Sequence, residues 1–245
     1  MISKTRLKEL SAFKLAKRCE EAGVFVVEGV KMAEEALHSG WSIVTVCATS
    51  VWWSTHLDLF SQYESYEVSE SELERLSGMR TPSAVWMLMM RDGDIPAGQP
   101  SSKLTLVLDH LQDPGNMGTI IRTADWFGVR QIVCSRDTVS CYNPKVVQST
   151  MGSLFRVGVH YTDLIQWLKE CQEPIYGAVL GGDDLFKSAF DLPAALVIGN
   201  ESRGISQEVR AMLTRPVEIP NRGGTAESLN ASVAAAILLA EVTRG

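Results

Sequence analysis

The chain has 245 residues, of which 45% are hydrophobic and 21% charged, a balance typical of a folded chain and not of a disordered one. Its formal net charge of −6 argues against a protein whose whole surface attracts nucleic acid. No apolar run reaches the ~20 residues that a membrane span requires. The basic N-terminus also lacks the apolar core of a signal peptide, so we expect a cytoplasmic protein.

The first ninety residues predict a small α/β module. The expected elements, in chain order, are a basic amphipathic helix over 3–20, a strand over 24–28, a helix over 30–39, a strand over 43–48, a helix near 70–76 and a strand over 84–90. Charge is segregated along this module. Residues 1–18 carry six Lys or Arg against a single Glu, whereas residues 54–74 carry six acids and no Lys or Arg. The acidic run is typical of a solvated helix face.

Residues 91–102 have the composition of a linker, with two Pro, two Gly and several small polar residues between apolar strands. We therefore expect one domain over 1–95, a linker over 96–102 and a second domain over 103–245.

The second domain alternates strands with helices, which predicts parallel βαβ units and a sheet covered on both faces. The expected strands are 104–109, 131–135, 155–159, 175–180, 195–199 and 216–219; the expected helices are 117–127, 144–152, 163–171, 205–213 and 227–243. Ligands of such sheets bind beyond the carboxyl ends of the strands. Three clusters of Gly and polar residues follow strands there, in residues 109–123, 198–205 and 219–232.

Several kinds of site are disfavoured. Gly199 and Gly204 have the spacing of a phosphate loop, but Ile205 stands where the phosphate-binding lysine is needed, and no GxGxxG follows a strand. Of four histidines only His110 lies beside a cluster, and no GxSxG motif accompanies it. The five cysteines form no CxxC and no zinc-ligand spacing, and no carboxylate cluster suggests a metal. We expect reduced thiols and no metal.

Taken together, the three clusters resemble the three motifs of the SpoU (TrmH-like) RNA ribose 2′-O-methyltransferases of the SPOUT superfamily. The matching residues are Asn116, Gly118, Arg122 and Thr123 in the first cluster, Gly199, Asn200, Glu201 and Gly204 in the second, and Ile219, Pro220, Ser228, Leu229, Asn230 and Ser232 in the third. The resemblance extends to residues 143–155 and to Phe25–Gly29, and so covers nearly the whole chain. The stretch from Ile219 to Leu229 is a residue or so longer and more polar than the family pattern.

The resemblance implies an α/β fold: a C-terminal parallel-sheet SPOUT domain with a trefoil knot and a small N-terminal, L30e-like substrate-binding domain. It also implies a homodimer and S-adenosylmethionine as the methyl donor. By motif position the donor would be held by Leu180, Gly181, Gly199, Ile219, Ser228 and Leu229. The same resemblance implies catalytic roles for Arg122, Asn116, Glu201, Ser228 and Asn230. Glycines that admit a nucleoside and apolar residues around it agree with such a site.

The roles of these residues also have simpler alternatives. Asn116 could cap a helix, Ser228 could cap the last helix, Glu201 could orient Arg122 or an asparagine, and Arg122 could form a structural ion pair. A guanidinium is a poor proton acceptor, so a phosphate clamp that lowers the pKa of the ribose hydroxyl is the physically easier role for Arg122.

The predicted activity is therefore methylation of a ribose 2′-hydroxyl in structured RNA, with rRNA favoured over tRNA. We expect RNA phosphates to contact Lys4, Lys14, Lys17, Arg18 and Lys145. The alternative is a non-catalytic RNA-binding or ribosome-assembly protein with the same fold; loss of Arg122, Glu201, Ser228 or Asn230 would favour it, and all four are present.

Overall fold

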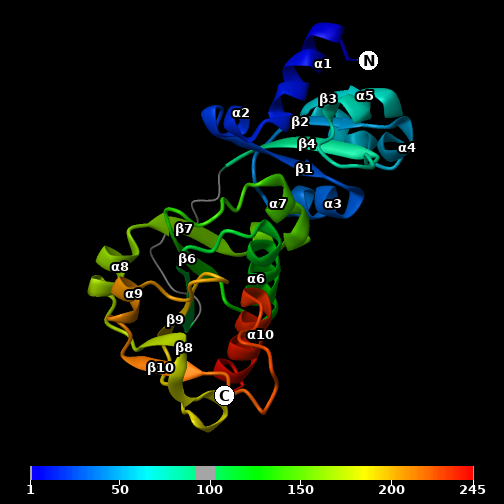
Figure 1. Cartoon of the computed structure of the whole chain (residues 1–245). Coiled ribbons are helices and arrows are strands. Elements are labelled where there is room, and N and C mark those ends of the chain that lie inside the picture. The colour runs from blue at the N-terminus through cyan, green and yellow to red at the C-terminus, as the bar shows by residue number, and fades with distance from the viewer. Residues whose placement is uncertain (1, 92–102, 245) are drawn as a thin grey trace. The chain divides into compact units, whose positions relative to one another are not determined.

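The computed structural model describes residues 2–91 and 103–244, which form two compact units (Figure 1). The first contains residues 2–91 together with Tyr142–Phe155, and the second contains residues 103–141 and 156–244. The linker predicted over 96–102 lies outside the described residues. No helix among the residues described is long and apolar enough to cross a membrane.

The first unit is built on a four-stranded sheet of order β1-β4-β2-β3, in which only the β2–β3 pair is parallel. Its elements are α1 (Lys4–Ser11), η1 (Ala12–Lys14), α2 (Ala16–Glu21), β1 (Val24–Glu28), α3 (Val30–His38), β2 (Ile43–Ala48), α4 (Ser50–Trp53), η2 (Leu57–Ser61), β3 (Glu64–Glu67), α5 (Glu70–Leu76), β4 (Val85–Met90), α7 (Pro144–Thr150) and η3 (Ser153–Phe155). Four of them, α4, η2, β3 and η3, are absent from the sequence prediction.

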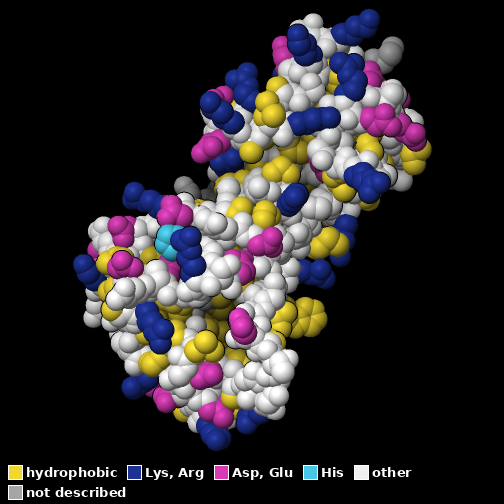
Figure 2. All heavy atoms as spheres, in the orientation of Figure 1, with side chains coloured by type: hydrophobic (Ala, Val, Ile, Leu, Met, Phe, Trp, Pro, Cys, Tyr) yellow, Lys and Arg dark blue, Asp and Glu magenta, His cyan; other side chains and the backbone are white. Residues whose placement is uncertain are grey.

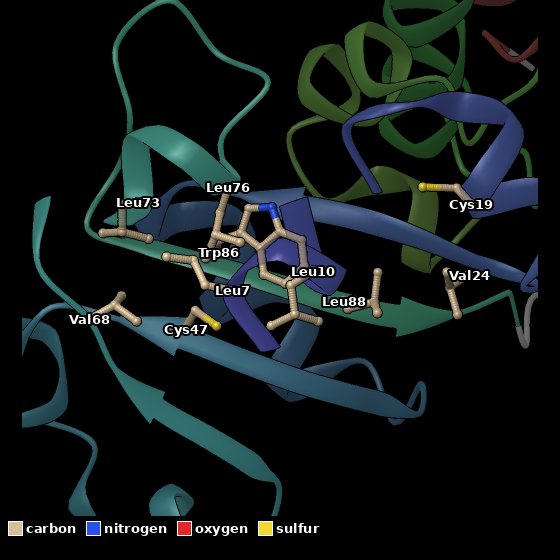
Figure 3. Packing of buried hydrophobic residues seen from close by; sticks show 10 residues of the cluster. All are labelled: Leu7, Leu10, Cys19, Val24, Cys47, Val68, Leu73, Leu76, Trp86 and Leu88. Atoms are coloured by element: carbon tan, nitrogen blue, oxygen red, sulfur yellow. The ribbon is translucent and has the colours of Figure 1, made fainter. Parts of the chain in front are cut away.

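The single helix predicted over 3–20 is wrong, because α1 ends at Ser11 and Leu15 is extended and exposed. Leu10 and Cys19 are nine residues apart, so an unbroken helix would point them to opposite sides. The break lets both residues reach one core, which α1, α2 and α5 build on one face of the sheet (Figure 3). Its buried members are Leu7, Leu10, Cys19, Val24, Cys47, Val68, Leu73, Leu76, Trp86 and Leu88.

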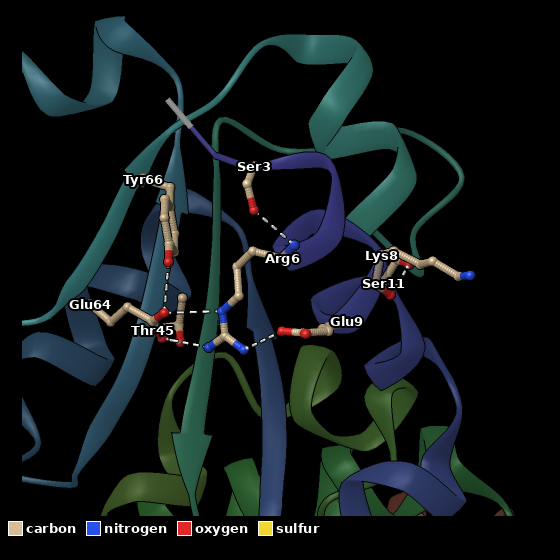
Figure 4. A network of polar contacts seen from close by, with 8 residues as sticks. All are labelled: Ser3, Arg6, Lys8, Glu9, Ser11, Thr45, Glu64 and Tyr66. Carbon is tan, nitrogen blue, oxygen red and sulfur yellow. Dashed lines mark hydrogen bonds and ion pairs between the residues drawn. The ribbon is translucent and has the colours of Figure 1, made fainter.

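A polar network ties α1 to β2 and β3 beside this core (Figure 4). Arg6 donates to both carboxylate oxygens of Glu64, at 3.0 and 2.6 Å, and also pairs with Glu9. Thr45 and Tyr66 donate their hydroxyl protons to the same Glu64 carboxylate. Burial alone would raise the pKa of Glu64, but these hydrogen bonds outweigh it and hold that pKa below its usual range.

The segment Tyr142–Phe155 belongs to the first unit through aromatic packing. The Phe25 ring lies 5.0 Å from the Tyr142 ring and 6.4 Å from the Phe155 ring, and Trp41 contacts Phe25 and Phe155 edge-on. Gly152 has a φ of +93°, and a Cβ there would overlap the Glu35 side chain. The 143–155 motif therefore has a packing role in the unit that contains the N-terminus.

The second unit is a six-stranded, all-parallel sheet of order β10-β8-β9-β5-β6-β7. Its elements are β5 (Leu104–Leu108), α6 (Pro114–Trp126), β6 (Gln131–Ser135), β7 (Gly158–Thr162), α8 (Leu164–Glu170), β8 (Ile175–Asp184), η4 (Leu185–Lys187), β9 (Ala194–Ile198), α9 (Gln207–Arg210), β10 (Arg215–Glu218) and α10 (Ala231–Val242). The helices α8 and α9 cover one face, and α6 and α10 pack together on the other (Figure 1).

Several predicted boundaries differ from the structure: β8 runs to Asp184 instead of 180, and α6 begins at Pro114 instead of 117. The strand predicted over 155–159 begins only at Gly158, because Ser153–Phe155 form a 3₁₀ turn. The helix predicted over 205–213 shrinks to Gln207–Arg210, and the last helix begins at Ala231 instead of 227. Asn230 caps that last helix by accepting hydrogen bonds from the amides of Ser232 and Val233, so the capping role considered for Ser228 is wrong.

Candidate active site

The three polar clusters meet at the carboxyl edge of the sheet in the second unit. The chain leaves β5 for α6 on one face, whereas it leaves the neighbouring β9 for α9 on the other face. Parallel sheets bind ligands where neighbouring strands turn to opposite faces in this way. The β5–β9 boundary is therefore where the topology alone predicts a site.

Asn116 is the residue that connects the three clusters. Its side chain, on a residue only 8% exposed, donates from Nδ2 to Glu201 Oε1 at 2.8 Å and accepts at Oδ1 from Asn230 Nδ2 at 2.9 Å. Because Asp113 caps α6, the capping role considered for Asn116 is wrong. Asn116 is thus free to bridge a carboxylate in the second cluster and an amide in the third.

The loop after β9 is folded back onto itself. Asn200 and Gly204 exchange both backbone hydrogen bonds at 2.9 Å, and a Cβ on Gly199 would lie 2.2–2.4 Å from backbone atoms of Gly204 and Ile205. Only glycine fits at position 199 in this loop. The fold-back carries Glu201 to its contact with Asn116.

The end of β8 departs from regular pairing next to β10. Pro216 pairs with Gly177, but the next residue, Val217, pairs with Asp183, so residues 178–182 form an excursion that the sequence did not predict. Leu180 is 73% exposed in this excursion, and the Gly181 amide donates to Glu218 Oε2 at 2.7 Å. The excursion brings an apolar side chain and a glycine to the surface at the end of β8.

The third cluster is an exposed loop between β10 and α10. Ile219 is half-buried at its start, whereas Ser228 is exposed and Leu229 is 46% exposed at its end. Asn221 stabilises the middle by accepting from the amides of Gly223 and Gly224. Of this cluster, Asn230 is placed in the Asn116 network, while Ser228 stands apart from it.

Arg122 lies on the exposed side of α6, and among the described residues no ion pair to it is found. Its neighbours on the helix surface are Thr119 and the 85%-exposed Trp126, while Asn116 lies on a different side. Glu201 therefore contacts the asparagine of the first motif and not its arginine, and the guanidinium of Arg122 is available to a ligand.

The predicted RNA-binding residues all belong to the first unit and differ in their surroundings. Lys14 donates to the Glu74 carbonyl at 3.1 Å, and Arg18 pairs with Glu21 at 3.1 Å. Lys4, Lys17 and Lys145 are exposed. Figure 2 shows Lys and Arg side chains gathered over α1 and α2.

Within the described residues no group of three or more His, Cys, Asp or Glu could hold a metal ion. The five cysteines are free thiols, four of them buried. Burial raises the pKa of Cys47 to about 12 and raises that of Cys134 well above its usual value. Such thiols are not nucleophiles at neutral pH.

Comparison with known proteins gives the family. Residues 103–240 match the model of the SpoU rRNA Methylase family, and residues 4–86 match that of the MRM3-like substrate binding domain. The chain belongs to the SpoU rRNA methylase family. The match confirms the family that the three motifs predicted, and it covers more than half of the chain.

Three relatives of the SpoU family illustrate the similarity. The 23S rRNA (guanosine(2553)-2′-O)-methyltransferase RlmP of Bacillus subtilis is 28% identical, over 96% of this chain and 94% of its own. The 23S rRNA (uridine(2479)-2′-O)-methyltransferase of Streptomyces viridochromogenes is 31% identical, over 91% and 83%. The AdoMet-bound rRNA methyltransferase of Sinorhizobium meliloti, a crystal structure, is 29% identical with a TM-score of 0.87, over 100% and 97%. The SPOUT fold predicted for residues 103–245 is thereby confirmed, while the knot stays a prediction.

Sequence reasoning did not single out two residues that contact the loop after β9. Asp109 and His110 follow β5 directly and contact the loop after β9, yet neither entered the list of site residues. Their position at the carboxyl end of a central strand was the available signal.

Proposed function

We infer that this chain is an S-adenosylmethionine-dependent RNA methyltransferase that modifies a ribose 2′-hydroxyl. One observation carries the inference: Asn116, Glu201 and Asn230, one from each family motif, form a single hydrogen-bonded chain. A fold retained only for binding has no need to keep a buried amide matched to a carboxylate and a second amide. Arg122, unpaired and exposed on the same helix, completes the set.

The loops at the sheet edge fit the methyl donor. S-adenosylmethionine supplies an electrophilic methyl group on a sulfonium. The missing side chain at Gly199 lets the loop after β9 pack closely on its own backbone, and the exposed Leu180 and Leu229 offer apolar surface to a nucleoside. We propose that these residues hold the donor with Gly181, Ile219 and Ser228. Donors of this kind carry no phosphate, which agrees with the absence of a phosphate-loop lysine at Ile205.

Arg122 has the properties of a phosphate clamp. It is permanently charged, so it can hold an RNA phosphate and stabilise the negative charge that develops on the 2′-oxygen. The Asn116–Glu201 bond fixes the start of α6 against the loop after β9. The chain thus positions the acceptor beside the donor, and proximity supplies much of the rate enhancement.

We also propose a homodimer formed through α10 and α6. A helix that is apolar all round is normally buried, yet α10 keeps Val233, Ala236, Ile237 and Ala240 on one partly exposed side. Trp126, 85% exposed, belongs to the neighbouring α6. Figure 2 shows an apolar side chain standing out from the surface beside these helices. Exposed apolar patches of this kind mark protein interfaces.

In the proposed division of labour, residues 1–95 grip RNA and residues 103–245 transfer the methyl group. The substrate is rRNA in preference to tRNA, because two relatives that are similar over most of their length are named for 23S rRNA. An enzyme acting on rRNA works where ribosomes are assembled, so we place it in the cytoplasm. Phosphate binding is local, through Lys4, Lys14, Lys17, Arg18 and Lys145, since the chain as a whole is acidic.

The activity is tested by incubating the purified protein with methyl-labelled S-adenosylmethionine and total RNA, followed by nuclease digestion. Label is expected in nuclease-resistant, 2′-O-methylated dinucleotides from rRNA. Asn116→Ala should remove the label, whereas Lys169→Ala, on the exposed side of α8, should keep it. Label in bases, or equal incorporation by the Asn116→Ala variant, contradicts the proposed function.

The RNA-binding surface has its own test. Changing Lys14, Lys17 and Arg18 together to Ala should weaken RNA binding and reduce its salt dependence, by a slope of up to about 3 in log K against log salt. The affinity for S-adenosylmethionine should stay unchanged. Wild-type RNA affinity in this variant between about 50 and 200 mM salt would leave η1 and α2 with a structural role only.

A further inference from the structure

Two residues after β5 hold both ends of the loop after β9. At the start of the loop, Asn200 Nδ2 donates to the His110 carbonyl at 2.8 Å. At its end, the Ser206 amide donates to Asp109 Oδ2 at 2.7 Å. The Asp109 amide donates to the Ile198 carbonyl at 2.9 Å, so the β5–β9 ladder continues into these contacts.

Asp109 is suited to this role by its burial. The residue is 1% exposed, and a carboxylate removed from water is stable only when it accepts hydrogen bonds. Hydrogen bonds to charged acceptors are also stronger than neutral ones. The hydrogen bond from the Ser206 amide to Asp109 is therefore strong, and it holds the end of the loop in place. No side chain of α9 itself caps this amide end, since Ser206 makes no side-chain cap.

His110 contributes through its backbone. Its φ is +54°, a left-handed conformation that a side chain rarely adopts. In this conformation its amide donates to Ser135 Oγ at 2.9 Å while its carbonyl accepts from Asn200. Its imidazole lies 3.3 Å from an Asp137 carboxylate oxygen and 3.6 Å from one of Asp109. The two backbone hydrogen bonds hold His110 in the left-handed conformation that reaches the loop, and the imidazole contacts are not needed for it.

Asn200 connects the His110 carbonyl to backbone amides within the loop. Its Oδ1 accepts from the amides of Ser202 and Arg203, at 2.9 and 3.2 Å, while its Nδ2 is held by His110. Gly199 directly precedes the first anchor and packs on the backbone of Gly204 and Ile205, while Glu201, which contacts Asn116, lies between the two anchors. The anchors thus set the positions of both.

We propose that Asp109 and the His110 carbonyl form a clamp that preorganises the 199–206 loop for the methyl donor, which makes Asp109 a positioning residue. The inference rests on the proposed function, because it takes the donor to bind at this loop. A loop that samples other shapes binds its ligand with an affinity reduced by the fraction of time that it is competent. Loss of the clamp should therefore act on donor affinity more than on the chemical step.

The test compares Asp109→Ala with three matched variants of the full chain. Calorimetry should show the Kd for S-adenosylmethionine rising about tenfold in Asp109→Ala, the change expected for losing a hydrogen bond to a charged group. The KM for the donor should rise in parallel. At saturating donor and RNA, kcat should stay within about threefold of wild type, because the reacting groups are intact once the donor is bound.

The matched variants separate positioning from folding. Asp109→Asn retains an acceptor for the Ser206 amide and should recover most of the affinity. Asp137→Ala removes the other carboxylate near His110, without touching the loop, and should bind normally. If Asp109→Ala does not fold, Asn200→Ala removes the other anchor and should show the same rise in Kd.

The outcomes are distinct. A folded Asp109→Ala or Asn200→Ala variant with a lower Tm and a wild-type donor Kd would show that the contacts are structural only, and would overturn the clamp. Equal losses in Asp137→Ala would also overturn it. Failure of the wild-type protein to bind the donor or methylate RNA would instead refute the proposed function.

Discussion

Gly199 gives the sharpest quantitative test of the loop after β9. A Cβ at this position would lie 2.2 Å from the Gly204 carbonyl carbon, 2.3 Å from the Ile205 nitrogen and 2.4 Å from the Gly204 oxygen. Ordinary contacts begin at 3.4 Å, so Gly199→Ala requires the backbone opposite to move by at least 1 Å. Backbone cannot rotate away as a flexible side chain can.

The displaced backbone carries the two hydrogen bonds between Asn200 and Gly204. Losing both costs about 1–3 kcal/mol, and overpacking adds about 1–3 kcal/mol, so we expect a total near 2–6 kcal/mol. Part of this will appear as distortion of the loop instead of global unfolding. The donor affinity should then fall at least tenfold, which corresponds to about 1.4 kcal/mol.

Gly204→Ala is the matched control, because it adds the same methyl group to the same loop. Gly204 has a φ of +69° but no atom within 4 Å of its added Cβ. The cost is therefore the left-handed conformation alone, about 1–2 kcal/mol. Urea unfolding and calorimetric titration of both variants decide the question. If Gly199→Ala were no worse than Gly204→Ala in either measurement, the close approach described for this loop would be refuted.

Three further predictions follow from other parts of the molecule. Arg122→Ala should abolish methyl transfer while leaving donor affinity within a few-fold. Calorimetry that shows lost donor binding with normal RNA binding would contradict the proposal that Arg122 holds an RNA phosphate. Ile237→Asp places a charge in the apolar side of α10 and should convert a dimer into a monomer in sedimentation, whereas a wild-type protein that already sediments at 26.9 kDa would remove the dimer. Glu64 has a lowered pKa in the folded state, so its contribution to stability is present above its unfolded pKa of about 4.3 and is lost as pH falls through the folded value. Urea unfolding should accordingly show that Glu64→Gln is less stable than wild type at pH 6, by no more than about 1 kcal/mol because Glu64 is 39% exposed. Near pH 3 the difference in unfolding free energy should be smaller. A difference that does not change with pH would contradict this prediction.

The sequence by itself determined the elements whose burial is periodic. Strands β1, β2, β4, β5 and β6 lie where the apolar runs predicted them, and α3 and α5 agree to within a residue. The three motifs gave the family and hence the fold of the second unit. These features were readable because each depends on neighbours a few residues away, and local spacing reports which side of an element is buried.

Only the tertiary structure showed which residues of the three motifs contact one another. Asn116 meets Glu201 across 85 residues of chain and Asn230 across 114, and these meetings depend on the order of strands in the sheet. Two local irregularities also depend on distant contacts. The helix breaks near Leu15 because Leu10 and Cys19 both pack in the same core, and residues 178–182 form an excursion because the pairing of β8 with β10 shifts register there.

Asp109 also combines a feature visible in the sequence with features that only the tertiary structure shows. Its place at the end of a predicted strand is visible in the sequence, but its burial and its bond to the Ser206 amide are not. Local patterns specify the pitch and burial of each element, whereas hydrogen bonds between distant loops exist only once the sheet has set which strand ends are neighbours.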